Sequence, residues 1–230
     1  MAIFGKSGVT NKTPGNIVFG AGTIHKGLKY TAGSGGGSGS WNFAESLVGA
    51  TTGGSKVSIV PKIANIEVDG IGVKSKGMAQ KTGETATMEI NFAELTKDII
   101  QAATLGQAGT SADTTYDVIE SKTEIAEGDY WENIAFVGKT LSGKYIIAIL
   151  ENALCTSGFE HEGKNNEGAA GKYTFESYAE FGDSTDMDQL PWHIYYPKAA
   201  TQGRGNPALN QSNQKEVLQC AKKKPIRCGK

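Results

Sequence analysis

Within the segment from Glu84 to Phe92, polar and apolar side chains alternate from Thr85 onward. Its apolar members are Ala86, Met88, Ile90 and Phe92, and its polar members are Thr85, Thr87, Glu89 and Asn91. Because successive side chains of a β-strand point to opposite faces, this spacing predicts a strand with one face in a core and the other face polar.

Several other segments carry strand patterns. The run from Tyr145 to Leu150 is apolar on both faces, which predicts a central strand or one that faces a neighbouring subunit. Residues 131–140 and 144–155 flank a Leu-Ser-Gly turn and predict a β-hairpin. A second, weaker hairpin is predicted around Gly-Ala-Gly, between residues 16–19 and 23–25. Further strands are predicted at 57–59, 62–68, 116–119, 172–181 and 192–196, with Ile63, Ile66 and Val68 as core contacts.

A single helix is predicted after the alternating strand. Asn91 can cap it and Glu94 can complete a start that resembles a capping box, while Gly106 ends it. Apolar residues recur between these limits at helical spacing: Leu95, Ile99 and Ala102. One helix among many strands, in a chain with 31 glycines and 6 prolines, predicts a mainly β fold.

Composition divides the 230 residues into three parts. Residues 1–15 are polar and rich in turn formers, which predicts an N-terminal arm. Residues 16–197 form the body, in which the low-complexity stretch 31–40 predicts an exposed loop. Residues 198–230 are rich in Ala, Gln, Asn and Lys and predict a basic C-terminal arm. A body of this length can bury a core without needing disulfides or a metal.

Charge is distributed unevenly along the chain. The last 30 residues carry seven basic residues and one acidic residue, whereas the first 200 carry sixteen basic and 23 acidic residues. Both arginines, Arg204 and Arg227, lie in the C-terminal arm. Arginine is the preferred residue for gripping phosphate and guanine. An acidic body without arginine is therefore a poor nucleic-acid binder and suits a surface that DNA passes without sticking.

The C-terminal arm contains the one sequence typical of a phosphate-binding segment, Lys222, Lys223, Lys224 and Arg227. These cations could neutralise phosphates, but no aromatic residues accompany them for base stacking. We interpret the segment as docking on an acidic neighbouring subunit, with a solvated tail as the alternative. The three cysteines, Cys155, Cys220 and Cys228, form no CxxC pair, which favours reduced thiols, with a Cys220–Cys228 bridge as the alternative.

Patterns for catalysis or cofactor binding are incomplete. Gly138-Lys139-Thr140 matches the end of a phosphate-binding loop, but Asn133 stands where its first glycine belongs. His161 lacks the second histidine of a zinc helix. The aspartates at 183, 186 and 188 lack the spacing of a calcium loop. The sequence therefore predicts no enzyme, no catalytic, cofactor-binding or metal-binding residue, and no cofactor. Without a long apolar run or an export signal, it also predicts no membrane association.

Three segments, in this order, resemble the major tail tube proteins of long-tailed, non-contractile bacteriophages. The first is NIVFGAGTIHKGL at 16–28, and the second is LVGATTGGSKVSIVPKIANIEVDGIG at 47–72. The third is KSKGMAQKTGETATMEINFAELTKDIIQAA at 74–103. The resemblance covers residues 15–197. The stretch GSGGGSGS and residues 201–230 fall outside it.

The resemblance implies a sandwich of two antiparallel β-sheets flanked by one α-helix. Six copies would join edge to edge so that their inner sheets form a β-barrel ring. Such rings stack helically into the tail tube of a siphophage virion, which conducts DNA into the host during ejection. The implied partners are further copies of the chain and the tape measure, tail terminator and distal tail proteins. Assembly would occur in the bacterial cytoplasm, and DNA would pass the lumen without specific binding. The tube protein of type VI secretion has a related fold.

Within this interpretation, three segments are expected to mediate assembly. The loop 71–83, with Lys74, Lys76 and Lys81, is expected to stack on the next ring. The arm 1–15 and the tail 200–230, including Lys222–Lys224 and Arg227, are expected to strap neighbouring subunits. Two alternatives stay open: a related bacterial tube of a secretion or phage-derived particle, and a monomeric sandwich that binds a ligand or carbohydrate.

Overall fold

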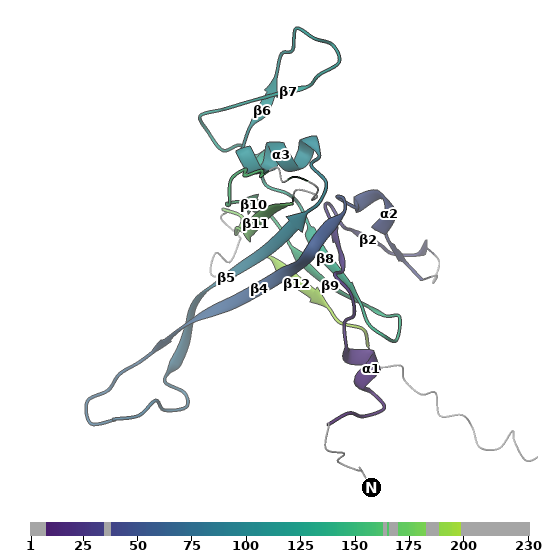
Figure 1. Cartoon of the computed structure of the whole chain (residues 1–230). Coiled ribbons are helices and arrows are strands. Elements are labelled where there is room, and N and C mark those ends of the chain that lie inside the picture. The colour runs from purple at the N-terminus through teal and green to yellow at the C-terminus, as the bar shows by residue number, and fades with distance from the viewer. Residues whose placement is uncertain (1–7, 35–37, 163–164, 166–169, 183–188, 199–230) are drawn as a thin grey trace, which may run out of the picture. The chain divides into compact units, whose positions relative to one another are not determined.

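The computed structural model describes residues 8–34, 38–162, 165, 170–182 and 189–198 (Figure 1). Contacts divide the chain into two units, 1–197 and 198–230. All that follows concerns the first unit and its described residues. These form four antiparallel sheets with few helices, which confirms the prediction of a mainly β fold.

One four-stranded sheet has the order β1-β8-β9-β12. Its strands are β1 (Thr23–His25), β8 (Ile134–Lys139), β9 (Tyr145–Leu150) and β12 (Trp192–Tyr195). Strands β8 and β9 pair from Ile134↔Leu150 to Lys139↔Tyr145, which confirms the predicted hairpin for this part of the chain. The apolar strand β9 is central, and Ile147 to Leu150 are buried, as predicted.

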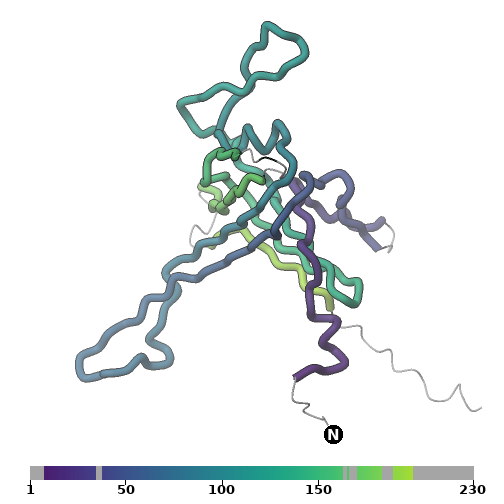
Figure 2. Tube along the Cα trace, viewed as in Figure 1, coloured from purple at the N-terminus to yellow at the C-terminus, as the bar shows by residue number. Residues whose placement is uncertain are grey.

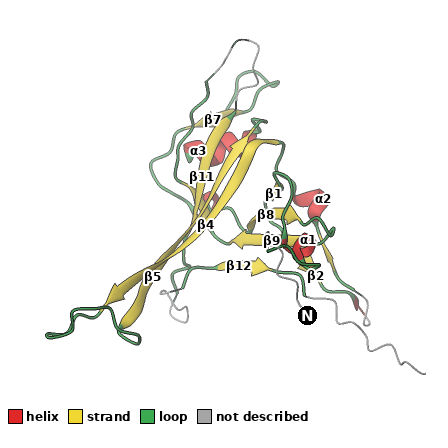
Figure 3. Cartoon of the chain, turned by 60° about the horizontal axis from the view of Figure 1, so that its bottom comes forward, coloured by secondary structure: helices red, strands yellow, loops and turns green. Residues whose placement is uncertain are grey.

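The second four-stranded sheet has the order β10-β11-β5-β4 (Figure 3). Its strands are β10 (Ala153–Cys155), β11 (Gly171–Ser177), β5 (Ala79–Phe92) and β4 (Thr51–Asn65). The alternating segment lies in β5, and its four apolar side chains are completely buried, as predicted. From β11, Tyr173 and Phe175 enter the same core.

The chain passes from the first sheet to the second at Asn152, which has a left-handed φ of 48°. Asparagine tolerates this conformation better than most residues. The predicted strand 144–155 is therefore divided into two strands, and the second of them, β10, pairs with β11 in the other sheet. One core cluster joins both sheets: Ile24, Ile134 and Leu150 of the first meet Met88, Ile90 and Phe175 of the second.

The segment 26–48 covers the other side of the first sheet. It holds the small sheet of β2 (Tyr30–Thr31) and β3 (Ser40–Trp41) and the one-turn helix α2 (Phe43–Ser46). Leu28, Trp41 and Phe43 pack on a second cluster, whose members are Ala135, Val137, Ile147 and Ile149. Strand β9 is apolar on both faces because each face is covered within the same chain.

The helix α3 (Lys97–Thr104) begins later than predicted. Its N-cap is Thr96, whose side-chain oxygen accepts a hydrogen bond from the Ile99 N–H at 3.4 Å. The expected cap, Asn91, still belongs to β5 and donates its side-chain amide to the Gly54 carbonyl at 3.1 Å. The helix cannot begin at Asn91 because β5 is still paired with β4 as far as Phe92. Leu105, with φ 49°, ends the helix one residue before Gly106.

The predicted hairpin of 16–19 with 23–25 is wrong. Strand β1 pairs with β8, and Val18 forms a bridge with Thr140 at the far end of the same strand. Several short elements were also not predicted. Among them are the helix α1 (Thr13–Asn16), the helix α2, the strands β2 and β3, and the 3₁₀ turn η2 (Glu127–Asp129). The predicted strand at 116–119 corresponds to β7 (Val118–Glu120), which pairs with β6 (Gln107–Gly109).

Candidate functional site

The longest feature of the molecule is the hairpin of β4 and β5, which continues well beyond the sheet (Figures 1 and 2). Strand β11 pairs with β5 only as far as Thr87, whereas β4 and β5 remain paired out to Asn65↔Ala79. From here on, the arm means residues 60–82; the segments at the two ends of the chain keep the names N-terminal arm and C-terminal arm. Its ladder contains a bulge between Lys62 and Ile63, and the Ile66 N–H bonds the Met78 carbonyl at 2.8 Å where the turn begins.

The arm is lined with exposed aliphatic side chains. Six of them have exposed fractions between 44% and 77%: Val60, Ile63, Ile66, Val68, Ile71 and Val73. The prediction that three of these contribute to the core is therefore wrong. The predicted strand 62–68 ends earlier, at Asn65, and β4 and β5 leave the second sheet before these residues are reached, so nothing in the described chain covers them.

The three predicted stacking lysines occupy different positions. Lys74 and Lys76 lie exposed in the turn of the arm. Lys81 lies in the ladder and its ammonium contacts the Glu84 carboxylate at 2.5 Å. The Glu84 side chain is only 5% exposed and also accepts the Leu190 N–H at 3.0 Å. The hydrogen bond from Lys81, followed by that from Leu190, lowers the pKa of Glu84 below its ordinary value. Glu84 thus ties the base of the arm to the residues before β12.

Strands β4 and β10 are the margins of the second sheet. Among the described residues, no strand pairs with the outer side of β4 along its fifteen residues. An unpaired margin of this length presents a row of free backbone donors and acceptors. Pro61 interrupts that row once, since it lacks an N–H.

The polar face of the second sheet points away from the core. Its central residue is Glu89 of β5, which lies opposite Lys56 of β4 and Thr174 of β11. One Glu89 oxygen contacts the Lys56 ammonium at 3.1 Å and the other contacts the Lys172 ammonium at 2.7 Å. Hydrogen bonds from Lys172 and then Lys56 lower the pKa of Glu89. With Glu176 nearby on β11, two lysines and two glutamates balance on this face.

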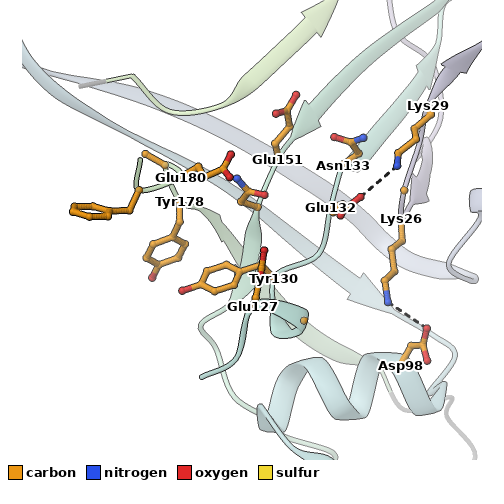
Figure 4. Close-up of a pocket in the computed structure, with 15 residues that line it drawn as sticks. Lys26, Lys29, Asp98, Glu127, Tyr130, Glu132, Asn133, Glu151, Tyr178 and Glu180 are labelled. Carbon is orange, nitrogen blue, oxygen red and sulfur yellow. Dashed lines mark hydrogen bonds and ion pairs between the residues drawn. The ribbon is translucent and has the colours of Figure 1, made fainter. Parts of the chain in front are cut away.

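A groove with a volume of about 1160 Å³ opens between the segment 26–29, the start of α3 and residues 178–181 (Figure 4). Two ion pairs line one side: Lys26 with Asp98 at 3.4 Å, and Lys29 with Glu132 at 3.3 Å. On the other side, Tyr178 meets Tyr130 edge to face, with ring centroids 5.7 Å apart. Burial, and then the charge of Glu176, raise the pKa of Tyr178.

The groove carries carboxylates beside its aromatic rings. Its remaining carboxylates are Glu127, Glu151 and Glu180. Glu151 contacts the exposed His193 ring at 2.9 Å, and the other two form no ion pair within the described chain. No serine, threonine, cysteine or histidine of the described chain lines it. Tyrosine rings next to carboxylates suit a sugar or a cationic side chain.

The other sequence candidates are dispersed. His25 is buried between the hydroxyls of Thr23 at 2.8 Å and Ser46 at 2.9 Å, and burial lowers its pKa. Gly138-Lys139-Thr140 ends β8 and enters a turn rather than a helix. Cys155 is buried as a free thiol. Within the described residues, no three His, Cys, Asp or Glu side chains gather in a way that would hold a metal.

Several predicted residues lie outside the described residues. These are Lys222, Lys223, Lys224 and Arg227 of the C-terminal arm, the cysteines Cys220 and Cys228, and the aspartates Asp183, Asp186 and Asp188.

Helices in the described part of the chain are all too short or too polar to cross a bilayer.

The sequence matches no protein-family model and no curated protein.

Proposed function

We propose that the chain is a structural protein that assembles with copies of itself into rings, and that the rings stack into the tail tube of a long-tailed phage. The observation that carries the proposal is the combination of the unpaired β4 margin with the exposed aliphatic arm. A protein that functioned alone would leave both features in water, where they promote aggregation.

The sheet margins support a ring. Strand β4 at one margin and β10 at the other belong to the same sheet. Ala153 already bonds Trp131 on the outer side of β10, so β4 of one copy would pair with the β10 margin of the next beyond Ala153 and extend the sheet from subunit to subunit. Contact between two different margins is a heterologous interface, which closes into a ring when the rotation per subunit divides a full turn. Six copies would turn the second sheet into a continuous barrel, with its polar face toward the lumen.

The arm supports stacking. Its exposed aliphatic residues run from Val60 to Val73 and are followed directly by Lys74 and Lys76, so an apolar contact with cations beside it would meet the neighbouring ring. Lys81 would act differently from the expected stacking contact, because it holds Glu84 at the base of the arm. Its role in this proposal is to position the arm.

The polar face supports passage of DNA. Along β5 this face offers Thr85, Thr87, Glu89 and Asn91, and no arginine occurs anywhere in residues 1–197. Its lysines and glutamates balance, so the face suits a wall that neither binds nor strongly repels a phosphate backbone. The acidic body predicted a surface that DNA passes without sticking, and the ion pairs of Glu89 would make this part of the wall close to neutral.

Size-exclusion chromatography and negative-stain microscopy of the purified full chain test the proposal. Six-fold rings or striated tubes are the expected result. A stable monomer of 24.2 kDa at high concentration would refute it. Deleting residues 203–230 should shorten or weaken the tubes while leaving the body folded, since that segment is proposed to strap neighbouring subunits. Tubes of unchanged length and thermal stability would contradict the strap.

One observation favours a second function, the binding of a carbohydrate by a monomer. The groove beside Tyr130 and Tyr178 combines aromatic faces with carboxylates, as sugar-binding surfaces require (Figure 4). This function predicts a monomer whose binding of glycans in an array is lost with Tyr178→Ala. It explains neither the arm nor the free margin of β4, and for that reason we rank it second.

A further inference from the structure

Glu89 is shared by two cations from two different strands. Lys56 reaches it from β4 and Lys172 from β11, and each ammonium contacts a different carboxylate oxygen, at 3.1 Å and 2.7 Å. The lysine side chains are 67% and 64% exposed, whereas the Glu89 side chain is 27% exposed. Both cations therefore lie within reach of solvent and of any polyanion that approaches this face.

These two lysines are the only cations on the part of the polar face where β4, β5 and β11 run side by side. The other neighbours of Glu89 on this outward-pointing face are Ser58, Thr85, Thr87, Asn91, Thr174 and Glu176. Lys62 lies opposite Gly83, where β11 no longer pairs. Without Glu89, this part of the sheet would present two free ammonium groups on adjacent strands.

Cross-strand ion pairs explain why lysines occur here at all. Opposite charges on neighbouring strands favour one register, and Lys56 faces Glu89 directly in the β4–β5 ladder. The same lysines would bind phosphates if they were unpaired, since lysine contacts supply most non-specific affinity for DNA. A single carboxylate that accepts hydrogen bonds from both ammonium groups keeps the ion pairs that favour the strand register and removes the affinity of the two lysines for DNA phosphates.

We propose that Glu89 is a specificity-determining residue, which occupies both lysines of the polar face and thereby prevents that face from binding the DNA backbone. This inference rests on the proposed function, in which DNA moves along the polar face. A phosphate that approaches must displace the Glu89 carboxylate, which is already in contact with both lysines. Glu89 belongs to the same sheet, so it can re-form these contacts without diffusing in from solution.

The test uses the full chain in its unassembled form, a fluorescent 20-base-pair DNA duplex and anisotropy at salt concentrations between 50 and 200 mM. Each lysine freed for a phosphate contact adds about 0.9 to the slope of log affinity against log salt. Glu89→Gln should therefore steepen the slope by about 1.8, so that affinity falls about 12-fold more than in the wild type over this range. The basic C-terminal arm contributes equally to every variant.

Glu176→Gln is the matched control. It removes one negative charge from the same face, and Glu176 forms no ion pair within the described chain, so no lysine is released and the wild-type slope is expected. The triple variant Lys56→Gln/Glu89→Gln/Lys172→Gln should also return to the wild-type slope. An unchanged slope in Glu89→Gln, or an equal change in Glu176→Gln, would overturn the inference.

The experiment is independent of ring assembly. A steeper slope in a chain that never forms rings would refute the proposed tube while leaving the role of Glu89 in place. Normal tubes together with an unchanged slope in Glu89→Gln would refute the role of Glu89 and leave the proposed tube in place. Urea unfolding of each variant establishes that the sheet is intact, and the partly exposed position of Glu89 makes unfolding by this substitution unexpected.

Discussion

Replacing the aliphatic side chains of the arm by threonine should separate assembly from folding. The triple variant Ile63→Thr/Ile66→Thr/Val73→Thr keeps β-branched residues, so the strand propensity of the hairpin is preserved. It removes much of the apolar surface that the arm exposes, because these three side chains are 61%, 58% and 77% exposed. The body should be unaffected, since none of the three belongs to either core cluster.

The magnitude follows from the exposed fractions. Burying a whole Val or Ile side chain contributes about 1.5–3 kcal/mol, so burying what is exposed here contributes about 1–2 kcal/mol per residue. Threonine keeps one methyl group, and we therefore expect the triple variant to lose about 3 kcal/mol per interface. That loss corresponds to a roughly 100-fold higher concentration for half-maximal assembly.

The assay is sedimentation of the assembled protein over a concentration series, with urea unfolding of the unassembled chain measured in parallel. Ile125→Thr is the matched control, because Ile125 is 53% exposed but lies outside the arm. Its assembly should equal that of the wild type. The reasoning fails if the triple variant assembles at the wild-type concentration, or if its unfolding free energy falls by more than about 1 kcal/mol, which would make the defect one of folding.

Three further predictions concern the body. Phe175→Ala removes a core ring that is 1% exposed and 4.8 Å from the Trp131 ring, and should cost about 3–5 kcal/mol in urea unfolding; a loss below about 1 kcal/mol would contradict the packing. The buried Tyr173 hydroxyl has no hydrogen-bond partner within the described chain, so Tyr173→Phe should gain about 1 kcal/mol and raise the Tm by about 2–4 °C, and a lower Tm would show that the hydroxyl is bonded. Burial raises the pKa of Asp129, but hydrogen bonds from Lys122 and the Ala126 N–H outweigh this and hold the pKa below the ordinary value of 3.8. A carboxyl group whose pKa is lower in the folded than in the unfolded state stabilises the fold at pH values above its unfolded pKa, and this stabilisation is lost as the pH falls through its folded pKa. Asp129→Asn should therefore cost about 2 kcal/mol of unfolding free energy at neutral pH, and the difference from the wild type should close below pH 3.8. A difference that does not change with pH would exclude the carboxylate as its source.

Local patterns predicted the elements whose burial is decided within the chain. The alternation in 84–92 and the apolar run at 145–150 both became strands with the predicted faces in the core. Two errors came from contacts that periodicity does not encode. Val18 and β1 pair with β8, more than 100 residues away, rather than with each other. The helix begins at its Thr96 cap because pairing with β4 extends β5 to Phe92.

The candidate site was predicted less completely than the fold. The stacking role of the segment 71–83 and its lysines stays a prediction. The aliphatic residues before it were assigned to the core, because an apolar strand pattern does not tell whether another part of the chain will cover it. The triad around Glu89 depends on which strands neighbour β5, and the register of β11 cannot be read from either strand alone. The groove joins segments from five parts of the chain and carries no motif.

The arm also connects the folding of one chain to its assembly. A two-stranded hairpin is marginally stable in water unless a third strand or a packed layer supports it. From Glu84 towards the tip of the arm, β11 no longer pairs with β5. The base is held by backbone pairing of β4 with β5, by the Lys81–Glu84 contact and by the Leu190 N–H on Glu84. Nothing in the described chain buries Ile63, Ile66 and Val73, and under the proposed function a neighbouring copy buries them. Amide hydrogens of residues 60–65 and 79–83 should therefore exchange quickly in the unassembled protein and become protected in tubes, whereas those of β9 should be protected in both. Equal protection of the arm in both forms would mean that the hairpin needs no neighbour, and the apolar stripe would lose its explanation as an interface.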